Sequence, residues 1–339
     1  MTEPPGLPAE HKDRSTLLFA FGIAEIVMGV FALLMAAVTG VTMLAGAAGM
    51  PGARGAAAPD PRMILPGIFF YLLLAAYYIS TGIGSIRVRR WARPIVLIVS
   101  WLWLVSGVVS LAMTSLFLPR FMEQARPPGI DSQMMSFAQG CAFVLLAVFY
   151  VILPGIFITV YGSAGVRATF ETRDRLPRWT DRCPTPVLGI CLLLAYSAVA
   201  LLVGAASGLP LFGLGLSRPA AVAVCLALAA VLPFLALATY RLRPWAWWAL
   251  LGLWILGALS SASFLSRRVD WKEMFQQLGL QAADVAMMEK MGLTKLFKGP
   301  EMTAVVAVFA LGGLVYLLWV RKHFRGGDTG HLRQEGDGG

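Results

Sequence analysis

Charged residues are scarce in this chain of 339 residues: they make up 14% of it, while hydrophobic residues make up 58%. An ordinary soluble domain contains roughly 25% charged residues and about half apolar ones. Folded as a soluble globule, this chain would expose large apolar patches to water. The composition therefore excludes a soluble enzyme, a disordered protein and a secreted disulfide scaffold. It indicates a polytopic membrane protein.

Groups that carry catalytic or metal chemistry are also scarce. The three histidines, His11, His323 and His331, lie near the two ends of the sequence. The four cysteines show no C-x-x-C spacing, so neither a metal site nor a redox motif is indicated. The sequence contains no Gly-rich phosphate loop, no G-x-S-x-G and no H-E-x-x-H. We therefore predict no catalytic residues, no metal, no cofactor and no enzymatic activity.

Acidic residues are outnumbered, with 18 Asp and Glu against 28 Lys and Arg and a formal charge of +10. In a soluble protein this excess would suggest nucleic acid as a partner. Here most basic residues lie in short clusters beside apolar runs, which is the pattern that sets the topology of membrane proteins. We therefore expect the lipid bilayer as the partner, and no nucleic acid.

Long apolar segments are abundant. A membrane-spanning helix needs about 20 mainly apolar residues. Eight segments meet this requirement: Leu17–Thr39, Met63–Ser85, Pro94–Leu118, Phe137–Tyr161, Val187–Ala205, Ala220–Thr239, Trp245–Leu265 and Thr303–Val320. The predicted fold class is an all-α integral membrane protein with about eight transmembrane helices.

The basic residues also predict the orientation. With the N-terminus inside, more than half of them fall in the inner connections, so both termini are predicted to be cytoplasmic. Most of the basic residues are arginine, and alanine and glycine are abundant, which is typical of a GC-rich bacterial genome. The expected location is the bacterial cytoplasmic (inner) membrane, as a multi-pass protein.

An internal repeat links the two halves. Ile86–Ala92 and Tyr240–Ala246 share R-x-R-x-W-A, and the ungapped match extends across neighbouring apolar segments. The alternative is that R-x-R-x-W-A is a common border of membrane helices. A duplication predicts two parallel four-helix repeats. The predicted division is a cytoplasmic N-terminus 1–16, a first unit 17–161, a basic cytoplasmic linker 162–186, a second unit 187–320 with an outer helical insertion 266–302, and a cytoplasmic polar tail 321–339.

Glu25 is the most informative single residue, because it lies about eight residues inside the first apolar segment. A charge at the bilayer centre costs about 3 kcal/mol on insertion scales, and no Lys or Arg lies within any of the eight segments. Gly22, Gly29, Ala32 and Ala36 share its helix face, and such a small-residue stripe lets helices approach closely. We therefore expect Glu25 to face another helix.

Hydroxyl groups of the second segment are the predicted partners of Glu25, because counting from the helix ends places them at a similar depth. The expected intramembrane polar cluster is Glu25, Tyr77, Tyr78, Ser80 and Thr81. One interpretation is a site sensitive to protons or ions. The other is an interhelical hydrogen bond that only fixes packing, since such contacts are common and contribute about 1 kcal/mol.

Basic and aromatic residues at the segment ends predict contacts with lipid headgroups of an anionic inner leaflet. The predicted interfacial residues are Arg87, Arg89, Arg90, Trp91, Arg178, Trp179, Arg241, Arg243 and Trp245. In the insertion 266–302, Trp271, Phe275 and Leu278 have helical spacing. This pattern predicts short amphipathic outer helices that could bind a protein partner.

The function favoured by these features is a transporter or permeation protein for a small solute or ion. The alternative is a non-catalytic membrane protein that acts as a sensor, an assembly factor or a partner-binding scaffold. The eight spans and Glu25 favour the first function, and the outer insertion favours the second.

Overall fold

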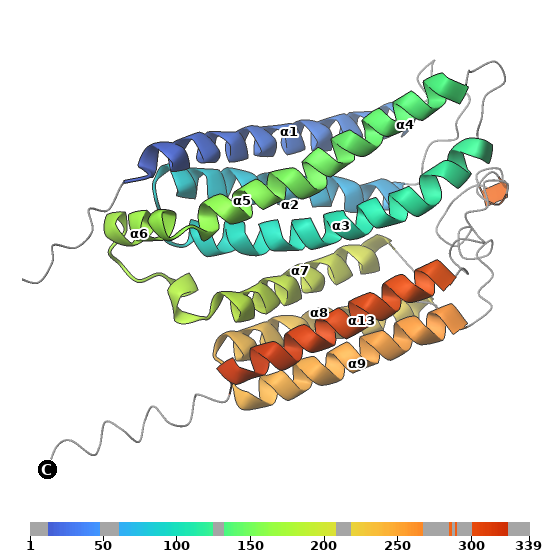
Figure 1. Ribbon diagram of the computed structural model, residues 1–339. Helices are drawn as coiled ribbons and strands as arrows, with labels where there is room; N and C mark the ends of the chain where they lie inside the picture. Colours follow the sequence, from blue (N-terminus) through green and yellow to red (C-terminus); the bar gives the residue numbers. More distant parts are fainter. Residues whose placement is uncertain are drawn as a thin grey trace, which may run out of the picture. The chain divides into compact units, whose positions relative to one another are not determined.

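A computed structural model describes residues 13–47, 61–124, 132–207, 218–266, 285–286, 289 and 300–324, and in these ranges every regular element is helical. The helices, in chain order, are α1 (Ser15–Ala47), α2 (Pro61–Ile86), α3 (Ala92–Gln124), α4 (Ser132–Ala147), η1 (Val148–Ile152), α5 (Leu153–Gly162), α6 (Ala164–Arg173), η2 (Trp179–Arg182), α7 (Thr185–Ser207), α8 (Arg218–Tyr240), α9 (Pro244–Ser266), α13 (Pro300–Val320) and η3 (Arg321–His323). The helix η1 is a π-helix that continues α4 into α5, so the three form one long helix (Figure 1).

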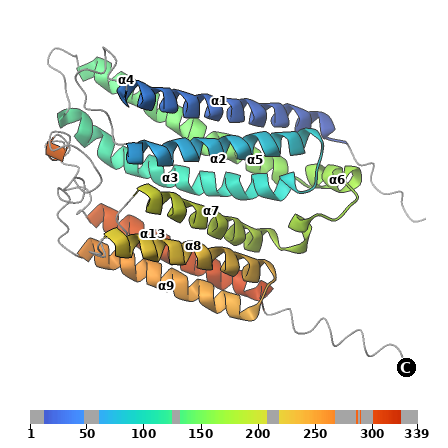
Figure 2. The same ribbon diagram turned by 180° about the vertical axis from the view of Figure 1, so that it is seen from behind.

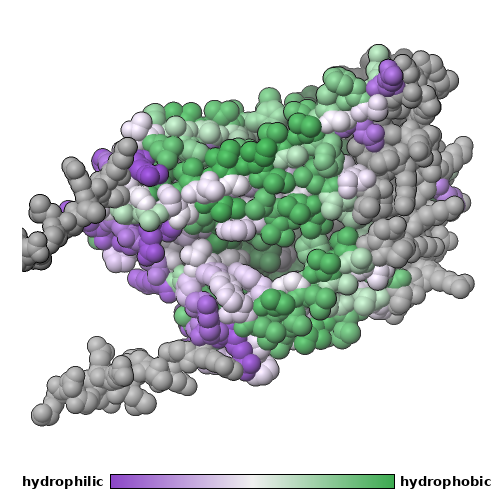
Figure 3. Space-filling model, viewed as in Figure 1, coloured by the Kyte–Doolittle hydropathy of each residue, from purple (hydrophilic) through white to green (hydrophobic). Residues whose placement is uncertain are grey.

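Eight helices in the described ranges are long and apolar enough to cross a membrane. They coincide with the eight segments predicted from the sequence, so the prediction of a multi-pass, all-helical membrane protein is confirmed at this level. Apolar side chains cover the helix walls, and polar side chains gather at the helix ends (Figure 3). Many large apolar residues are exposed along the helices, as expected for surfaces that contact lipid.

The chain divides into two compact units. Unit 1 comprises Met1–Val38, Phe70–Leu116 and Pro128–Thr185, and unit 2 comprises Thr39–Phe69, Phe117–Pro127 and Pro186–Gly339. Within unit 1, α1, α2, α3 and the long helix α4–η1–α5 run side by side, and within unit 2 the same holds for α7, α8, α9 and α13 (Figures 1 and 2). We call the end of unit 1 at the α2–α3 connection, and the end of unit 2 at the α8–α9 connection, the turn end of that unit.

Helices α1 and α2 are in backbone contact because glycines lie where they cross. A Cβ atom added to Gly22 would lie 2.8 Å from the carbonyl oxygen of Gly82, and one added to Gly82 would lie 2.7 Å from the carbonyl oxygen of Gly22. Gly29 meets Ile79 and the Ala75 carbonyl in the same way. The small-residue face predicted from the sequence is buried, which agrees with its expected contact with another helix.

The turn end of unit 1 is covered by the short helix α6, which the sequence analysis did not single out within the linker 162–186. Ser163 caps its N-terminus by accepting a hydrogen bond from the Val166 N–H at 3.4 Å. Val166 and Phe170, one turn apart, are buried against Leu18 and Phe157. This packing of one apolar face stabilises a helix that is otherwise polar and too short to persist alone.

Within unit 2, two tryptophans of α9 form hydrogen bonds with the backbone of α13. The indole N–H groups of Trp247 and Trp254 donate to the carbonyls of Leu317 and Ala310 at 2.9 and 3.0 Å. Gly313 makes room for the Trp254 ring, which would overlap any Cβ atom at that position. The predicted outer helices of 266–302, the residues before 13 and those after 324 lie outside the described residues, apart from the ends and isolated positions given above.

Candidate intramembrane carboxylate site

Glu25 lies on the face of α1 that packs inside unit 1, and its side chain is 1% exposed. The Tyr161 hydroxyl, at the end of α5, donates to Glu25 Oε1 at 2.9 Å. The Ser85 hydroxyl, at the end of α2, donates to Glu25 Oε2 at 3.3 Å. Tyr161 and Ser85 are themselves 2.8 Å apart, oxygen to oxygen. Three helices therefore bring their polar groups into one closed triangle.

A count of protons indicates which state of Glu25 completes the triangle. Each of its three oxygen–oxygen contacts needs one proton between the two oxygens. The two hydroxyls supply two protons, and an ionised carboxylate supplies none. A protonated Glu25 supplies the third proton. When the carboxyl is protonated, Glu25 donates one bond and accepts the other, and all three contacts are then hydrogen bonds.

Aromatic rings pack around Tyr161 of the triangle. Phe21 of α1 meets the rings of Phe157 and Tyr161 edge to face, at centroid distances of 5.4 and 6.2 Å. Phe157 and Tyr161 stack at 6.0 Å, and Phe170 of α6 lies 6.4 Å from Tyr161. These rings exclude water from the carboxyl group, so any charge that forms there is poorly screened.

The residues predicted to surround Glu25 lie on α2, but most of them take other partners. Thr81 is buried beside the carboxyl group, and its hydroxyl also donates to the Tyr77 carbonyl at 2.9 Å. Ser80 is exposed and donates to the same carbonyl at 2.9 Å. The rings of Tyr77 and Tyr78 pack on each other at 4.8 Å, and no hydrogen bond from their hydroxyls to Glu25 is found in the described part of the chain.

Ser85 and Tyr161, which the sequence analysis did not include, donate to Glu25, and the predicted Thr81 lies beside the same carboxyl group. The estimate by depth missed Ser85 because it assumed that α1 and α2 end at the same level. Gly22 lies opposite Gly82 and Ile86, so α1 extends past the end of α2 by about two turns. Tyr161 could have been suspected only as a polar residue at the end of an apolar segment, since no pattern indicates which span packs on α1.

The fourth span is interrupted by the π-helix η1, which ends nine residues before Tyr161. The Leu153 N–H donates to the Val148 carbonyl, five residues earlier. Pro154 has no N–H to donate to the Tyr150 carbonyl, four residues earlier, and so breaks the α-helical pattern at this point. That carbonyl faces Gly107 of α3, where any Cβ atom would overlap it. Such π-helical segments are frequent at functional sites and mark a place where a helix can bend.

At the turn end of unit 1, carboxylates of the linker hold several of the predicted interfacial arginines. Asp174 accepts from the Arg90 N–H at 3.2 Å and from two nitrogens of the Arg178 guanidinium, both at 3.1 Å. Asp181 accepts from the Arg178 N–H at 2.8 Å and pairs with Arg90 at 3.5 Å. Burial alone would raise the pKa of Asp174, but the bonds from Arg178 and Arg90 and the charges of Arg178 and Arg89 together hold it below its ordinary value.

The other predicted interfacial residues differ in exposure and in their contacts. Trp91 is half-buried against Gly84, whereas Trp179 is exposed. Exposed positions without an ion pair in the described ranges are Arg87, Arg89, Arg241 and Arg243. Trp245 is exposed and stacks on Phe234 at 5.8 Å.

The turns Ile86–Ala92 and Tyr240–Ala246 have the same backbone structure. Val88 and Leu242 both have positive φ, at 49° and 54°. Four hydrogen bonds recur at positions 154 residues apart, among them Arg89 N to Gly84 O and Arg243 N to Ala238 O, at 2.8 and 3.1 Å. Both turns are Schellman motifs, which usually place glycine at the residue with positive φ. The motif shared in sequence therefore corresponds to a shared turn, in which both positive-φ positions carry a residue other than glycine.

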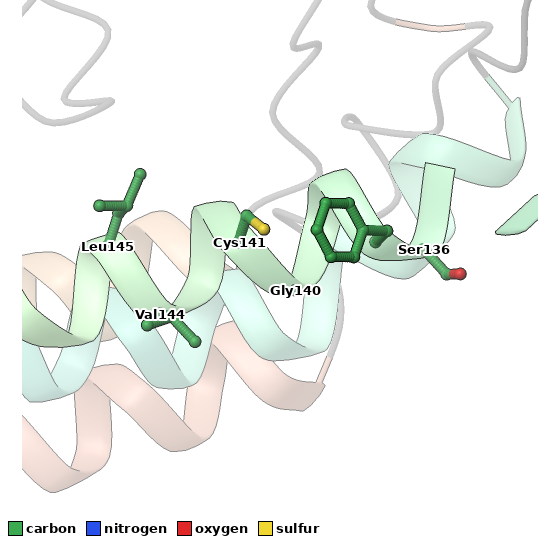
Figure 4. A pocket seen from close by; sticks show the side chains of 6 residues that line it. Ser136, Gly140, Cys141, Val144 and Leu145 are labelled. Carbon is green, nitrogen blue, oxygen red and sulfur yellow. The ribbon is translucent and has the colours of Figure 1, made fainter. Parts of the chain in front are cut away.

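The other candidate sites in the described ranges offer fewer polar or ionisable side chains. Residues of α4 line an open apolar concavity, without a charged side chain: Ser136, Phe137, Gly140, Cys141, Val144 and Leu145 (Figure 4). In the ranges that the structure describes, no three His, Cys, Asp or Glu side chains lie together in a way that could hold a metal ion.

Comparison with known proteins adds no identity: no family model, no curated protein and no solved structure matches this chain.

Proposed function

We propose that this chain is a membrane transport or permeation protein for a small solute or ion, in which Glu25 binds and releases a proton. The observation that carries the proposal is the triangle of Glu25, Ser85 and Tyr161. A buried ionisable residue within a membrane span is a functional-site hypothesis in its own right. The site exchanges a proton and forms no covalent bond, so the proposed function is not enzymatic.

The surroundings of the triangle support a site that can change state. The titratable groups around Glu25 are Tyr77 and Tyr78 of α2 and Tyr161 of α5, and no lysine or arginine neutralises it in the described part of the chain. The only nearby guanidinium on α3, that of Arg93, donates to the Tyr161 backbone carbonyl at 2.9 Å. The π-helix η1 supplies a flexible joint on the helix that carries Tyr161. Loss of the proton would break the triangle and favour movement of α5.

The wider organisation belongs to the same proposal. The recurring turn supports two parallel four-helix repeats that arose by duplication. The excess of arginine at the turn ends supports a multi-pass protein of the bacterial cytoplasmic membrane with both termini in the cytoplasm.

Proton flux into proteoliposomes tests the proposal. Vesicles with an internal pH dye and an imposed membrane potential are expected to acidify faster with the wild-type protein than without protein. Glu25→Gln is expected to reduce flux to the rate of empty vesicles. The matched control is Glu171→Gln, which removes an exposed carboxylate on α6 and is expected to leave flux unchanged. Wild-type flux equal to that of empty vesicles, or unchanged flux in Glu25→Gln, would contradict the proposal.

Infrared spectroscopy separates a functional carboxyl group from one that only fixes packing. The absorption band of a protonated carboxyl group, identified by its loss in Glu25→Gln, is expected to disappear and return as the bulk pH is raised and lowered. A band that stays constant over the whole pH range in which the protein is folded would assign Glu25 a structural role only.

The second candidate is a non-catalytic sensor, assembly factor or partner-binding scaffold. The observation that favours it is the linker of unit 1, where α6, Asp174 and Asp181 build an ordered surface outside the membrane. Partner capture by the wild-type chain, compared with a chain that carries Arg167→Glu and Glu171→Arg on the exposed face of α6, tests whether this surface is a docking site. Identical partners from both chains would exclude that site.

A further inference from the structure

The two Schellman turns differ in whether a carboxylate of the chain lies beside them in the described structure. In unit 1, the turn holds an oxyanion of the chain itself: the Asp174 carboxylate accepts the Arg90 N–H at 3.2 Å, and the charge of Arg89 acts on it. The fold therefore contains one example of this turn with a bound carboxylate. It shows that an R-x-R turn of this geometry is compatible with an anion beside it.

In unit 2 the same turn has no such anion. Arg241 and Arg243 occupy the positions of Arg87 and Arg89, both are exposed, and no acidic residue in the described ranges pairs with them. Pro244 occupies the position of Arg90 and has no N–H, so a carboxylate cannot bind to the backbone as Asp174 does. No described residue therefore competes with an outside anion for these two guanidinium groups.

Further cations lie at the same end of unit 2. The Arg321 guanidinium carbon lies 4.6 Å from the centroid of a Trp247 ring, and Lys322 Nζ lies 4.6 Å from that of Trp319. Because Trp247 is in the first turn of α9, these contacts place the end of α13 beside the α8–α9 turn. The described helix ends that meet here contain no Asp or Glu. Among the described residues, the turn end of unit 2 is therefore a cationic rim without an acidic side chain.

Exposed aromatic and apolar side chains adjoin this cationic rim. Trp245 is 47% exposed, Trp248 60% and Trp319 49%. Tryptophans at such positions lie at the level of lipid headgroups in membrane proteins. On α8, Phe234 and Leu237 are also exposed, next to the arginines and on the membrane side of them. A ligand that suits this surface carries an anionic head and an apolar body.

We propose that the rim formed by Arg241, Arg243, Arg321 and Lys322 is a binding site for the headgroup of an anionic phospholipid. The phosphate oxygens would accept hydrogen bonds from the Arg241 and Arg243 guanidinium groups. The acyl chains would lie along Phe234 and Leu237. At the corresponding turn of unit 1, Arg87 and Arg89 are also exposed, but the carboxylates of Asp174 and Asp181 already lie there, bonded to Arg90 and Arg178.

Native mass spectrometry of the delipidated full-length protein tests this assignment. Phosphatidylglycerol is titrated against wild type and the double variant Arg241→Gln/Arg243→Gln. Each basic residue near an anionic surface contributes about 1 kcal/mol, so the double variant is expected to bind roughly thirtyfold more weakly. Phosphatidylcholine is expected to bind both proteins equally and weakly. Equal binding of the two lipids to wild type would overturn the proposal.

A matched control distinguishes binding at the rim from a general effect of the protein's net charge. Arg175→Gln/Arg182→Gln removes two exposed arginines of the unit 1 linker that form no ion pair in the described ranges. It is expected to leave phosphatidylglycerol binding within about twofold of wild type, well short of the loss at the rim. If both double variants lose affinity equally, attraction is a matter of total charge and the rim is not a site.

Two further measurements keep the outcome interpretable. Arg241→Lys/Arg243→Lys retains the charge and is expected to restore most of the binding, which excludes misfolding as the cause of the loss. Soluble glycerol phosphate is expected not to compete, because it lacks the apolar body. Competition by glycerol phosphate at the concentration of the lipid would assign the rim to a soluble phosphate compound and contradict the lipid.

Discussion

Ser85 of unit 1 and Thr239 of unit 2 occupy the same position, three residues before the residue with positive φ in two identical turns. The Ser85 hydroxyl belongs to the triangle with Glu25 and Tyr161. The Thr239 hydroxyl is fully buried, and no partner for it is found in the described structure. Unit 2 therefore forms the same helix hairpin without the polar triangle. The hairpin does not require Glu25, which favours a role for Glu25 beyond folding.

The largest expected loss of stability follows a substitution where α1 and α2 cross, at Gly22 near Glu25. Gly22→Val would force apart two backbones that are now in contact, and overpacking of this kind costs about 3 kcal/mol. Unfolding of the purified protein in mixed micelles measures the loss. Gly40→Val on the same helix is the control, since a Cβ atom there meets nothing within 4 Å. Equal stability of the two variants would mean that α1 and α2 do not cross at Gly22.

Removal of the Tyr161 hydroxyl tests the triangle itself. Tyr161→Phe keeps the ring and deletes the donor to Glu25 and the contact with Ser85, at an expected cost of about 1.5–2 kcal/mol. The same unfolding measurement detects it. Tyr196→Phe, on exposed helix surface of unit 2, is the control and is expected to change little. A loss no larger than that of the control would show that the hydroxyl contributes nothing to Glu25.

The bonds that Asp174 accepts from Arg90 and Arg178 make the stability of unit 1 depend on pH. The pKa of Asp174 is lowered in the folded state, so its stabilisation is present above the ordinary value of 3.8 and is lost as the pH falls through the folded-state pKa. Asp174→Asn is therefore expected to be less stable than wild type at neutral pH, by less than Tyr161→Phe, and the difference is expected to close on acidification. Unfolding midpoints measured from neutral pH to about pH 3 check this.

The control for the pH series is a variant that removes no titratable group. Leu176→Ala, in the same linker, removes an exposed apolar side chain, and its difference from wild type should not vary with pH. A pH-independent difference for Asp174→Asn would contradict the assigned ion pairs.

The smallest expected effect falls on the unit 2 counterpart of the triangle. Thr239→Val replaces a buried hydroxyl that has no partner by a methyl group of similar size, so stability is expected to stay constant or to rise by up to about 1 kcal/mol. Ser85→Ala is expected to lower it by about 1 kcal/mol. Similar destabilisation by both variants would mean that the two units do not differ in the way described.

The eight spans were predictable because hydrophobic length is a local property of the sequence. The burial of Glu25 was predictable for the same reason, since Gly22, Gly29 and Ala32 mark the packed face of one helix. Both inferences depend on residues that are neighbours within a single element.

The partners of Glu25 were not predictable, because they depend on how helices are placed relative to one another. Tyr161 is separated from Glu25 by 136 residues, and Ser85 pairs with Glu25 because α1 extends past the end of α2. The π-helix η1 was missed as well. It involves a contact with another helix, because the Tyr150 carbonyl lies against Gly107 of α3, where no Cβ atom would fit.

The backbone contact of Gly22 with Gly82 also determines by which route a proton can reach Glu25. Between α1 and α2 no space remains for a side chain on the Gly22 side, and Gly29 closes the next turn against Ala75 and Ile79. A chain of water molecules cannot enter through this seam. A proton route to Glu25, as proposed above, would therefore have to pass a different helix contact, and on the α5 side the Tyr161 hydroxyl covers the carboxyl group.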